Sequence, residues 1–195
     1  SNLSNSIIEI KKIDERFENL KKIQNIFLNC YFDSPNTENL YKELISNKKT
    51  DFSRYNYFYA KYLHGLGKVQ EAKKILNSSL KKYPRNLLLN QYKFDLENSE
   101  NNFSFDFKKE THVIAEILYI VANAFSSQSI YSASNFYLNL SKYLNKDFHA
   151  FDTLMAENFY NIDDLVNSKK IYESLEQYGD AFKWFSNKQI SRILV

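Results

Sequence analysis

The sequence predicts an all-α fold built from antiparallel helix pairs, and three observations lead to that expectation. Pro and Gly are scarce, at 2 and 3 of 195 residues, which argues against strands joined by tight turns. Lys, Glu, Leu, Ile and Ala fill long runs with helical spacing. The segment 57–86 reads as two short helices, with small residues or helix breakers at Ala60, Gly67, Ala72 and Pro84.

The N-terminal region, residues 5–50, is expected to hold two helices. Apolar residues with 3/4 spacing predict one long amphipathic helix over roughly 5–31. Ser34-Pro35 breaks it, and a short helix follows near 37–47. Asn36 or Thr37 is expected to cap that helix by accepting its first free N–H groups.

A repeat begins at residue 53. Placing Ala72 on Ala133, an offset of 61 residues, and on Ser168, an offset of 96, predicts helix pairs over 53–86, 114–147 and 149–179. The insertion over 86–108 is interpreted as a degenerate half-repeat, with a helix to about Asn98 and a polar loop over 99–107. A terminal helix is expected over 180–195.

The repeats predict where helices cross closely. One helix pair cannot bury both of its faces, so neighbouring pairs must stack, and small residues are needed at the crossings. These positions are Ala60, Ala72, Ala133, Ala156 and Ser168.

The spacing of Ala60, Gly67, Ala72 and Pro84 resembles the tetratricopeptide repeat. The resemblance is good over 53–86 and weaker over 114–147 and 149–179, which lack the turn Gly and exit Pro. Longer strings such as Ala156-Glu-Asn-Phe-Tyr160 resemble tetratricopeptide proteins of AT-rich alphaproteobacteria. The resemblance implies an α-solenoid with a right-handed superhelix, here an internal piece of a longer array.

The resemblance also implies a concave groove, lined by the first helix of each pair, that holds a peptide or partner helix. The residues carried onto this groove are Arg54, Tyr57, Lys61, His64, Leu118, Ala122, Phe125, Thr153, Glu157 and Tyr160. Tyr57 and Tyr160 are expected to be exposed. Some family members clamp a C-terminal carboxylate with Lys and Asn at these positions. Tyr57 and Lys61 do not reproduce that clamp.

The residue patterns predict no catalytic site, metal site or cofactor. No phosphate-binding Gly-rich loop, nucleophile elbow or His-Glu-x-x-His occurs. The three histidines, His64, His112 and His149, are isolated, so each is interpreted as a surface or groove residue. The pair Asp163-Asp164 is explained by a helix N-terminus.

Net charge and composition limit which classes of protein remain for this chain. The net charge is +3, which does not by itself imply nucleic acid, and the lone Cys30 excludes a disulfide framework. No apolar run approaches the roughly 20 residues of a membrane span. The compartment is left open. Most of the 15 Tyr and 16 Phe fall on packing positions.

The sequence therefore favours a non-catalytic protein–protein interaction scaffold. The alternative is an RNA-binding helical repeat of the pentatricopeptide kind, because the first half of the chain is basic. The basic residues are Lys73, Lys74, Lys81, Lys82 and Arg85. The terminal helix, with Trp184, is interpreted either as a solvating cap or as the first half of a severed repeat. A severed repeat would expose an apolar face and favour a homodimer.

Overall fold

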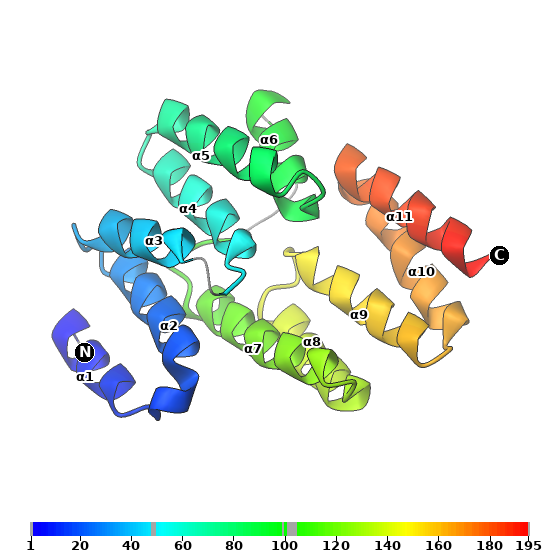
Figure 1. Cartoon of the computed structure of the whole chain (residues 1–195), viewed down its shortest axis with the longest axis horizontal. Coiled ribbons are helices and arrows are strands. Elements are labelled where there is room, and N and C mark those ends of the chain that lie inside the picture. Colours follow the sequence, from blue (N-terminus) through cyan, green and yellow to red (C-terminus); the bar gives the residue numbers. More distant parts are fainter. Residues whose placement is uncertain (1, 48–49, 99, 101–104, 195) are drawn as a thin grey trace. The chain divides into compact units, whose positions relative to one another are not determined.

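The structure is a computed structural model that describes residues 2–47, 50–98, 100 and 105–194 (Figure 1). Every regular element within these residues is a helix, as the sequence predicted. In chain order the elements are α1 (Leu3–Lys11), the 3-10 turn η1 (Glu15–Phe17), α2 (Glu18–Tyr31), α3 (Thr37–Ser46), α4 (Ser53–Gly65), α5 (Val69–Lys82), α6 (Leu87–Asn98), α7 (Glu110–Ser127), α8 (Tyr131–Leu144), α9 (Ala150–Asn161), α10 (Leu165–Leu175), η2 (Glu176–Tyr178) and α11 (Asp180–Ile193).

The chain divides into two compact units. Unit 1 comprises Ser1–Lys93 together with Phe107–Lys109, and unit 2 comprises Phe94–Asp106 together with Glu110–Val195. In unit 1 the sequential pairs α1–α2, α2–α3, α3–α4 and α4–α5 pack on one another, and in unit 2 α7 to α11 do so. Helix α6 crosses the division. One repeat domain over residues 1–195 stays a prediction.

Within the described residues, four turns between consecutive helices share one backbone geometry. They join α2 to α3, α4 to α5, α7 to α8 and α9 to α10. One residue in each turn has a positive φ, namely Asp33 (53°), Gly67 (76°), Ser129 (61°) and Asp163 (60°). The next residue donates its N–H to the carbonyl five positions earlier, at 2.9 Å in all four turns. This is the Schellman arrangement, which satisfies carbonyls that a helix end leaves open.

The turns correct the expected register of the second repeat. Ser129 lies 62 residues after Gly67, so the offset is 62 and not 61. Ser134 takes the place of Ala72 and is fully buried, whereas Ala133 is only half-buried. The third repeat keeps its predicted offset, because Asp163 lies 96 residues after Gly67.

The same geometry reveals a helix pair that was not recognised as a copy. Asp33 lies 34 residues before Gly67, and Ser34 donates its N–H to the carbonyl of Asn29 as Lys68 does to Leu63. The α2–α3 pair is therefore joined in the same way as α4–α5. Asp replaces Gly at its turn, which Asp tolerates better than most residues do.

Small residues lie where the paired helices cross. Ala60 and Ala72 are fully buried, as are their counterparts Ala122 with Ser134 and Ala156 with Ser168. The Ser168 hydroxyl donates a hydrogen bond to the Ala156 carbonyl at 2.9 Å. A side chain thus reaches the backbone of the neighbouring helix directly, which requires a close approach of the two axes.

The N-terminal expectations need two corrections. The single helix over 5–31 is wrong, because α1 ends at Lys11 and a new helical stretch begins after Asp14. Asp14 is extended and its carboxylate accepts the N–H of Arg16 at 2.8 Å, so it caps the new stretch. The cap predicted for α3 is also wrong. The Thr37 hydroxyl donates a hydrogen bond to the Ser34 carbonyl at 2.7 Å. The Asn36 side chain accepts no hydrogen bond from the first N–H groups of α3.

The other predicted helices are confirmed with adjusted ends. Helix α6 fills the range expected to Asn98, and α11 fills that expected after 180. Helix α7 begins at Glu110 and not near 114. Of the expected loop over 99–107, residues 99 and 101–104 lie outside the described residues, and residues 105–107 are not helical.

Aromatic rings fill the cores of both units. In unit 1, Tyr41 of α3 stacks on Tyr59 of α4 with 5.0 Å between ring centroids. Unit 2 also contains a buried amide. Fully buried Asn158 accepts from Ser126 at 2.6 Å and donates to Ser134 and Asn135, each at 2.8 Å. These bonds join α7, α8 and α9.

Candidate partner-binding surface

The unit 1 part of the predicted groove begins with a correction. Tyr57 was expected to be exposed, but it has 0% exposure. Its ring packs edge-on against Tyr92 of α6, with centroids 5.0 Å apart. Because α6 lies against α4 at this point, the side chain belongs to the core of unit 1.

The other predicted residues of α4 remain accessible beside Tyr92. Lys61 is half-buried, and its ammonium lies 5.6 Å from the centroid of the Tyr92 ring. Exposed His64 places Nδ1 3.0 Å from the Tyr92 hydroxyl. Partial desolvation of the His64 ring by its neighbours, and next the positive charge of Lys61, lowers the pKa of His64. Arg54, half-buried, lies over the Phe58 ring at 5.7 Å.

The one-residue shift of register changes the predicted residues of α7. Ala122 is fully buried at the helix crossing, so it is not on an accessible face. Leu118 is half-buried, and the ring of Phe125 stacks on Tyr137 of α8 with centroids 5.6 Å apart. The positions equivalent to Tyr57, Lys61 and His64 are instead Tyr119, Asn123 and Ser126.

The predicted residues of α9 keep their register and remain partly accessible. Thr153, Glu157 and Tyr160 are all half-buried. The Thr153 hydroxyl donates to the Ala150 carbonyl at 2.9 Å, within its own helix. Glu157 and Tyr160 face side chains of the next two helices.

A four-residue cluster joins α9, α10 and α11. The Tyr172 hydroxyl donates to Glu157 at 3.0 Å, and Arg192 reaches the other carboxylate oxygen at 3.5 Å. The Arg192 guanidinium lies 4.0 Å from the centroid of the Tyr160 ring. Burial, and then the Glu157 carboxylate, raises the pKa of Tyr172, so the phenol stays a hydrogen-bond donor at neutral pH. The side chains of Arg192 and Glu157 are 43% and 37% exposed, which leaves both accessible to a ligand.

We give the name α7–α9–α11 face to five residues: Glu157 and Tyr160 with Arg192, which brings them together, and Asn123 and Ser126, which the corrected register predicts on α7. Ser126 itself binds the buried amide of Asn158 on α9. Together the five side chains carry an amide, a hydroxyl, a carboxylate, an aromatic ring and a guanidinium. These groups suit peptide recognition, since Arg and Tyr are enriched where binding energy is concentrated.

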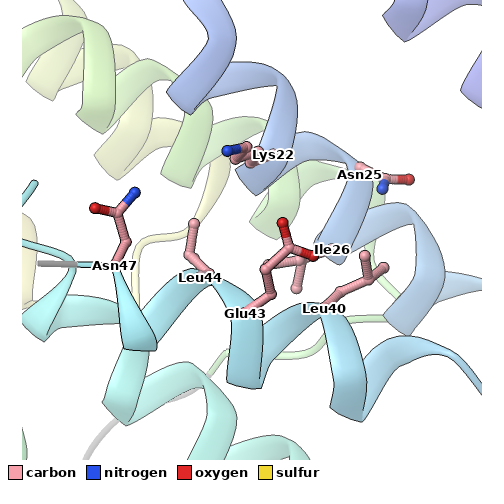
Figure 2. Close-up of a pocket in the computed structure, with 7 residues that line it drawn as sticks. All are labelled: Lys22, Asn25, Ile26, Leu40, Glu43, Leu44 and Asn47. Carbon is pink, nitrogen blue, oxygen red and sulfur yellow. The ribbon is translucent and has the colours of Figure 1, made fainter. Parts of the chain in front are cut away.

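A hollow of about 440 Å³ lies between α2 and α3. Figure 2 shows the seven side chains that line it, three from α2 and four from α3 and the residue that follows it. Ile26 and Leu44 are almost fully buried, whereas Lys22 and Glu43 bring opposite charges. Its volume is within the range of small-ligand sites. No residue of this hollow was among the predicted site residues.

Three contact residues escaped the sequence reasoning. Tyr92 and Arg192 lie on α6 and α11, for which the sequence predicts a degenerate half-repeat and a terminal helix. Phe107 lies in the segment predicted to be a polar loop. A signal for the last was present, because Phe103, Phe105 and Phe107 alternate with polar residues, a pattern typical of a chain segment that packs on one side.

Cys30 and Asp164 each have a structural setting that the described residues define. Buried Cys30 has its pKa raised by burial to about 12, so its thiol is not a ready nucleophile. Asp164 accepts the N–H of Asn167 at 3.1 Å as the cap of α10, in agreement with the prediction for Asp163-Asp164. The described part of the chain holds no group of three or more His, Cys, Asp or Glu placed to bind a metal. None of its helices is both long and apolar enough to cross a membrane.

Comparisons with known proteins add no identity. No protein-family model matches the chain, and neither a curated protein nor a solved structure matches it.

Proposed function

We propose that the chain is a non-catalytic interaction scaffold of the tetratricopeptide type, whose helix pairs stack into a right-handed solenoid. The proposal rests on one observation, the recurrence of the same Schellman turn at Asp33, Gly67, Ser129 and Asp163. Serial helix pairs of this kind present extended surfaces, and their accepted use is to bind another chain.

The α7–α9–α11 face is the favoured place for that partner in unit 2. Glu157 and Arg192 hold each other in position while both stay more than a third exposed. A peptide or helix that offers a carboxylate to Arg192 and a hydrogen-bond donor to Glu157 would form further hydrogen bonds with both side chains. In unit 1, Lys61 and His64 beside Tyr92 are the corresponding accessible residues.

A phage-displayed library of random dodecapeptides, selected on the immobilised chain, tests this function. Enriched peptides are resynthesised with a fluorescent label and titrated against wild type, Glu157→Gln, Arg192→Gln and Lys61→Gln. Affinity is expected to fall at least tenfold with a change on the face that binds the peptide. Lys170→Gln, on the exposed side of α10, is the matched control and should bind as wild type does.

Two results would overturn the proposal. One is a selection that enriches no peptide above uncoated support. The other is a set of enriched peptides that bind all variants with equal affinity.

RNA binding is a second candidate, favoured by the outer side of α5. Lys74, Lys81, Lys82 and Arg85 are all exposed there or just after it. The equivalent positions of α8 include Phe136 and Tyr143, so the cationic set is not repeated. A titration with labelled oligouridylate separates the two functions, because binding to phosphates weakens steeply with salt and with the change Lys81→Gln/Lys82→Gln.

A further inference from the structure

The ring of Phe107 lies among aromatic side chains of unit 1. The centroid of the Phe107 ring lies 6.1 Å from that of Phe27 on α2, and 6.4 Å and 6.3 Å from those of Phe58 and Tyr62 on α4. The Phe58 and Tyr62 rings meet it edge-on, an arrangement that favours aromatic pairs beyond the area they bury. Two helices thus provide one receptor for an aromatic side chain.

The next residue, Lys108, binds the C-terminal end of α2. Its ammonium donates to the carbonyls of Tyr31 at 2.6 Å and Cys30 at 3.1 Å, and it lies 2.6 Å from the Asp33 carboxylate. Helix C-termini attract cations through their open carbonyls and the helix dipole. Asp33, at the positive-φ position of the turn, adds a full negative charge.

The side chains of this site differ in burial. Phe27 and Phe58 have 0% exposure and pack edge-on against each other with centroids 5.3 Å apart. By contrast, Phe107 is only half-buried, and the side chains of Lys108 and Asp33 are 46% and 75% exposed. Phe27 and Phe58 are therefore part of the core, whereas Tyr62, Phe107, Lys108 and Asp33 lie nearer the surface.

We propose that this aromatic–lysine site, formed by Phe27, Phe58, Tyr62, Asp33 and the end of α2, recognises an aromatic residue followed by lysine in a partner protein. Phe107 and Lys108 of the chain itself are the resident competitor. The inference rests on the proposed function, since it assigns a chemistry to one of the scaffold's partners. The charge of the site selects a basic partner, because Asp33 and two carbonyls receive one ammonium.

Competition between the tethered segment and an added peptide changes the apparent affinity for that peptide in a known direction. A tethered occupant has an effective concentration of the order of millimolar, which lowers the apparent affinity of any peptide added from outside. Removing the resident side chains must therefore strengthen binding of the same chemistry in trans. The size of that gain measures how well the vacated site accepts an aromatic residue followed by lysine from outside.

The test uses the chain of 195 residues and a fluorescein-labelled peptide with the sequence of residues 105–110. The double variant Phe107→Ala/Lys108→Ala is expected to bind it at least tenfold more tightly than wild type does. Peptides in which Ala replaces the Phe that corresponds to Phe107, or Gln replaces the Lys that corresponds to Lys108, should not show that gain in affinity. Lys109→Ala, which removes an exposed neighbour, should behave as wild type.

The proposal is overturned if the folded double variant binds the peptide no better than wild type, or if it binds the Ala-substituted peptide equally well. Should the double variant fail to fold, Lys108→Gln alone carries the test. It alters one half-exposed side chain, and affinity at least threefold above wild type is expected. The library experiment reads binding through Glu157, Arg192 and Lys61, none of which belongs to the aromatic–lysine site, so its success beside a failure here would reject the aromatic–lysine site alone.

Discussion

The Ser168 hydroxyl donates a hydrogen bond to the carbonyl of Ala156 across the crossing of α9 and α10, and neither residue is exposed to solvent. The hydroxyl occupies little more space than the methyl group of Ala72 at the equivalent crossing of α4 and α5. It also finds a partner for its polar atom, so burial does not leave an unsatisfied donor. Small size at this position is therefore a steric requirement common to the α4–α5, α7–α8 and α9–α10 pairs.

The first prediction tests the register at the α7–α8 crossing. Ser134→Leu should overpack it and reduce the free energy of unfolding by about 1–3 kcal/mol, because the side chain is fully buried. Ala133→Leu, one residue earlier and half-buried, is the control and should change stability by less than about 0.5 kcal/mol. Urea denaturation measures both. A larger loss for Ala133→Leu would restore the offset of 61.

The second prediction concerns the positive φ values in the turns. Ser129→Gly should stabilise the chain by about 0.5–1 kcal/mol, because Gly adopts that conformation without a steric penalty. Gly67→Ala should destabilise by about 1 kcal/mol through conformation alone, since a Cβ at Gly67 meets nothing within 4 Å. Thermal melts of the two variants should shift in opposite directions. Shifts of the same sign would contradict the role given to these turns.

The third prediction concerns the buried amide of Asn158. Asn158→Ala removes the partner of Ser126, Ser134 and Asn135 at once and should cost about 2–4 kcal/mol. Asn187→Ala, an exposed amide on α11, controls for the loss of an Asn side chain and should be nearly neutral. Equal melting temperatures for the two variants would argue against the network.

The fourth prediction follows from the pKa of His64, which burial and Lys61 hold below its ordinary value of 6.5. The folded chain then binds fewer protons at this ring than the unfolded chain does. The stability it contributes is therefore complete above the unfolded pKa and falls as the pH drops through about 6.5. His64→Gln should lose less stability than wild type between about pH 7.5 and pH 5, as measured by urea denaturation. An identical loss in both proteins would assign the pH dependence to other groups.

Local rules account for most of what the sequence predicted. Gly67, Ala72 and Pro84 located the α4–α5 pair, because a Gly turn, a small crossing residue and a Pro exit each have a short-range cause. The second copy was displaced by one residue because adjacent small residues, Ala133 and Ser134, fit the pattern equally well. The choice between them depends on which one faces α7, and that is a tertiary property.

The candidate surface was harder to predict because burial depends on neighbours that are distant in sequence. Tyr57 has the position of a groove residue, and only the packing of Tyr92 from α6 makes it part of the core. Glu157 and Tyr160 are predicted groove residues, and Tyr160, expected to be exposed, is half-buried. Arg192, which lies against both, follows them by more than 30 residues. Asp14 escaped notice for a different reason, since its capping role competes with an apolar period that continues through it.

The shared turns also bear on how the chain acquires its structure. Each turn is closed by bonds that span only a few residues, such as that from Lys68 to Leu63, and each pair joins helices adjacent in sequence. Contacts this local are made with little loss of chain entropy, which places helical repeats among the fast-folding topologies. Each hairpin can thus begin to form while the rest of the chain is still unfolded, and stacking against the next pair supplies the remaining stability.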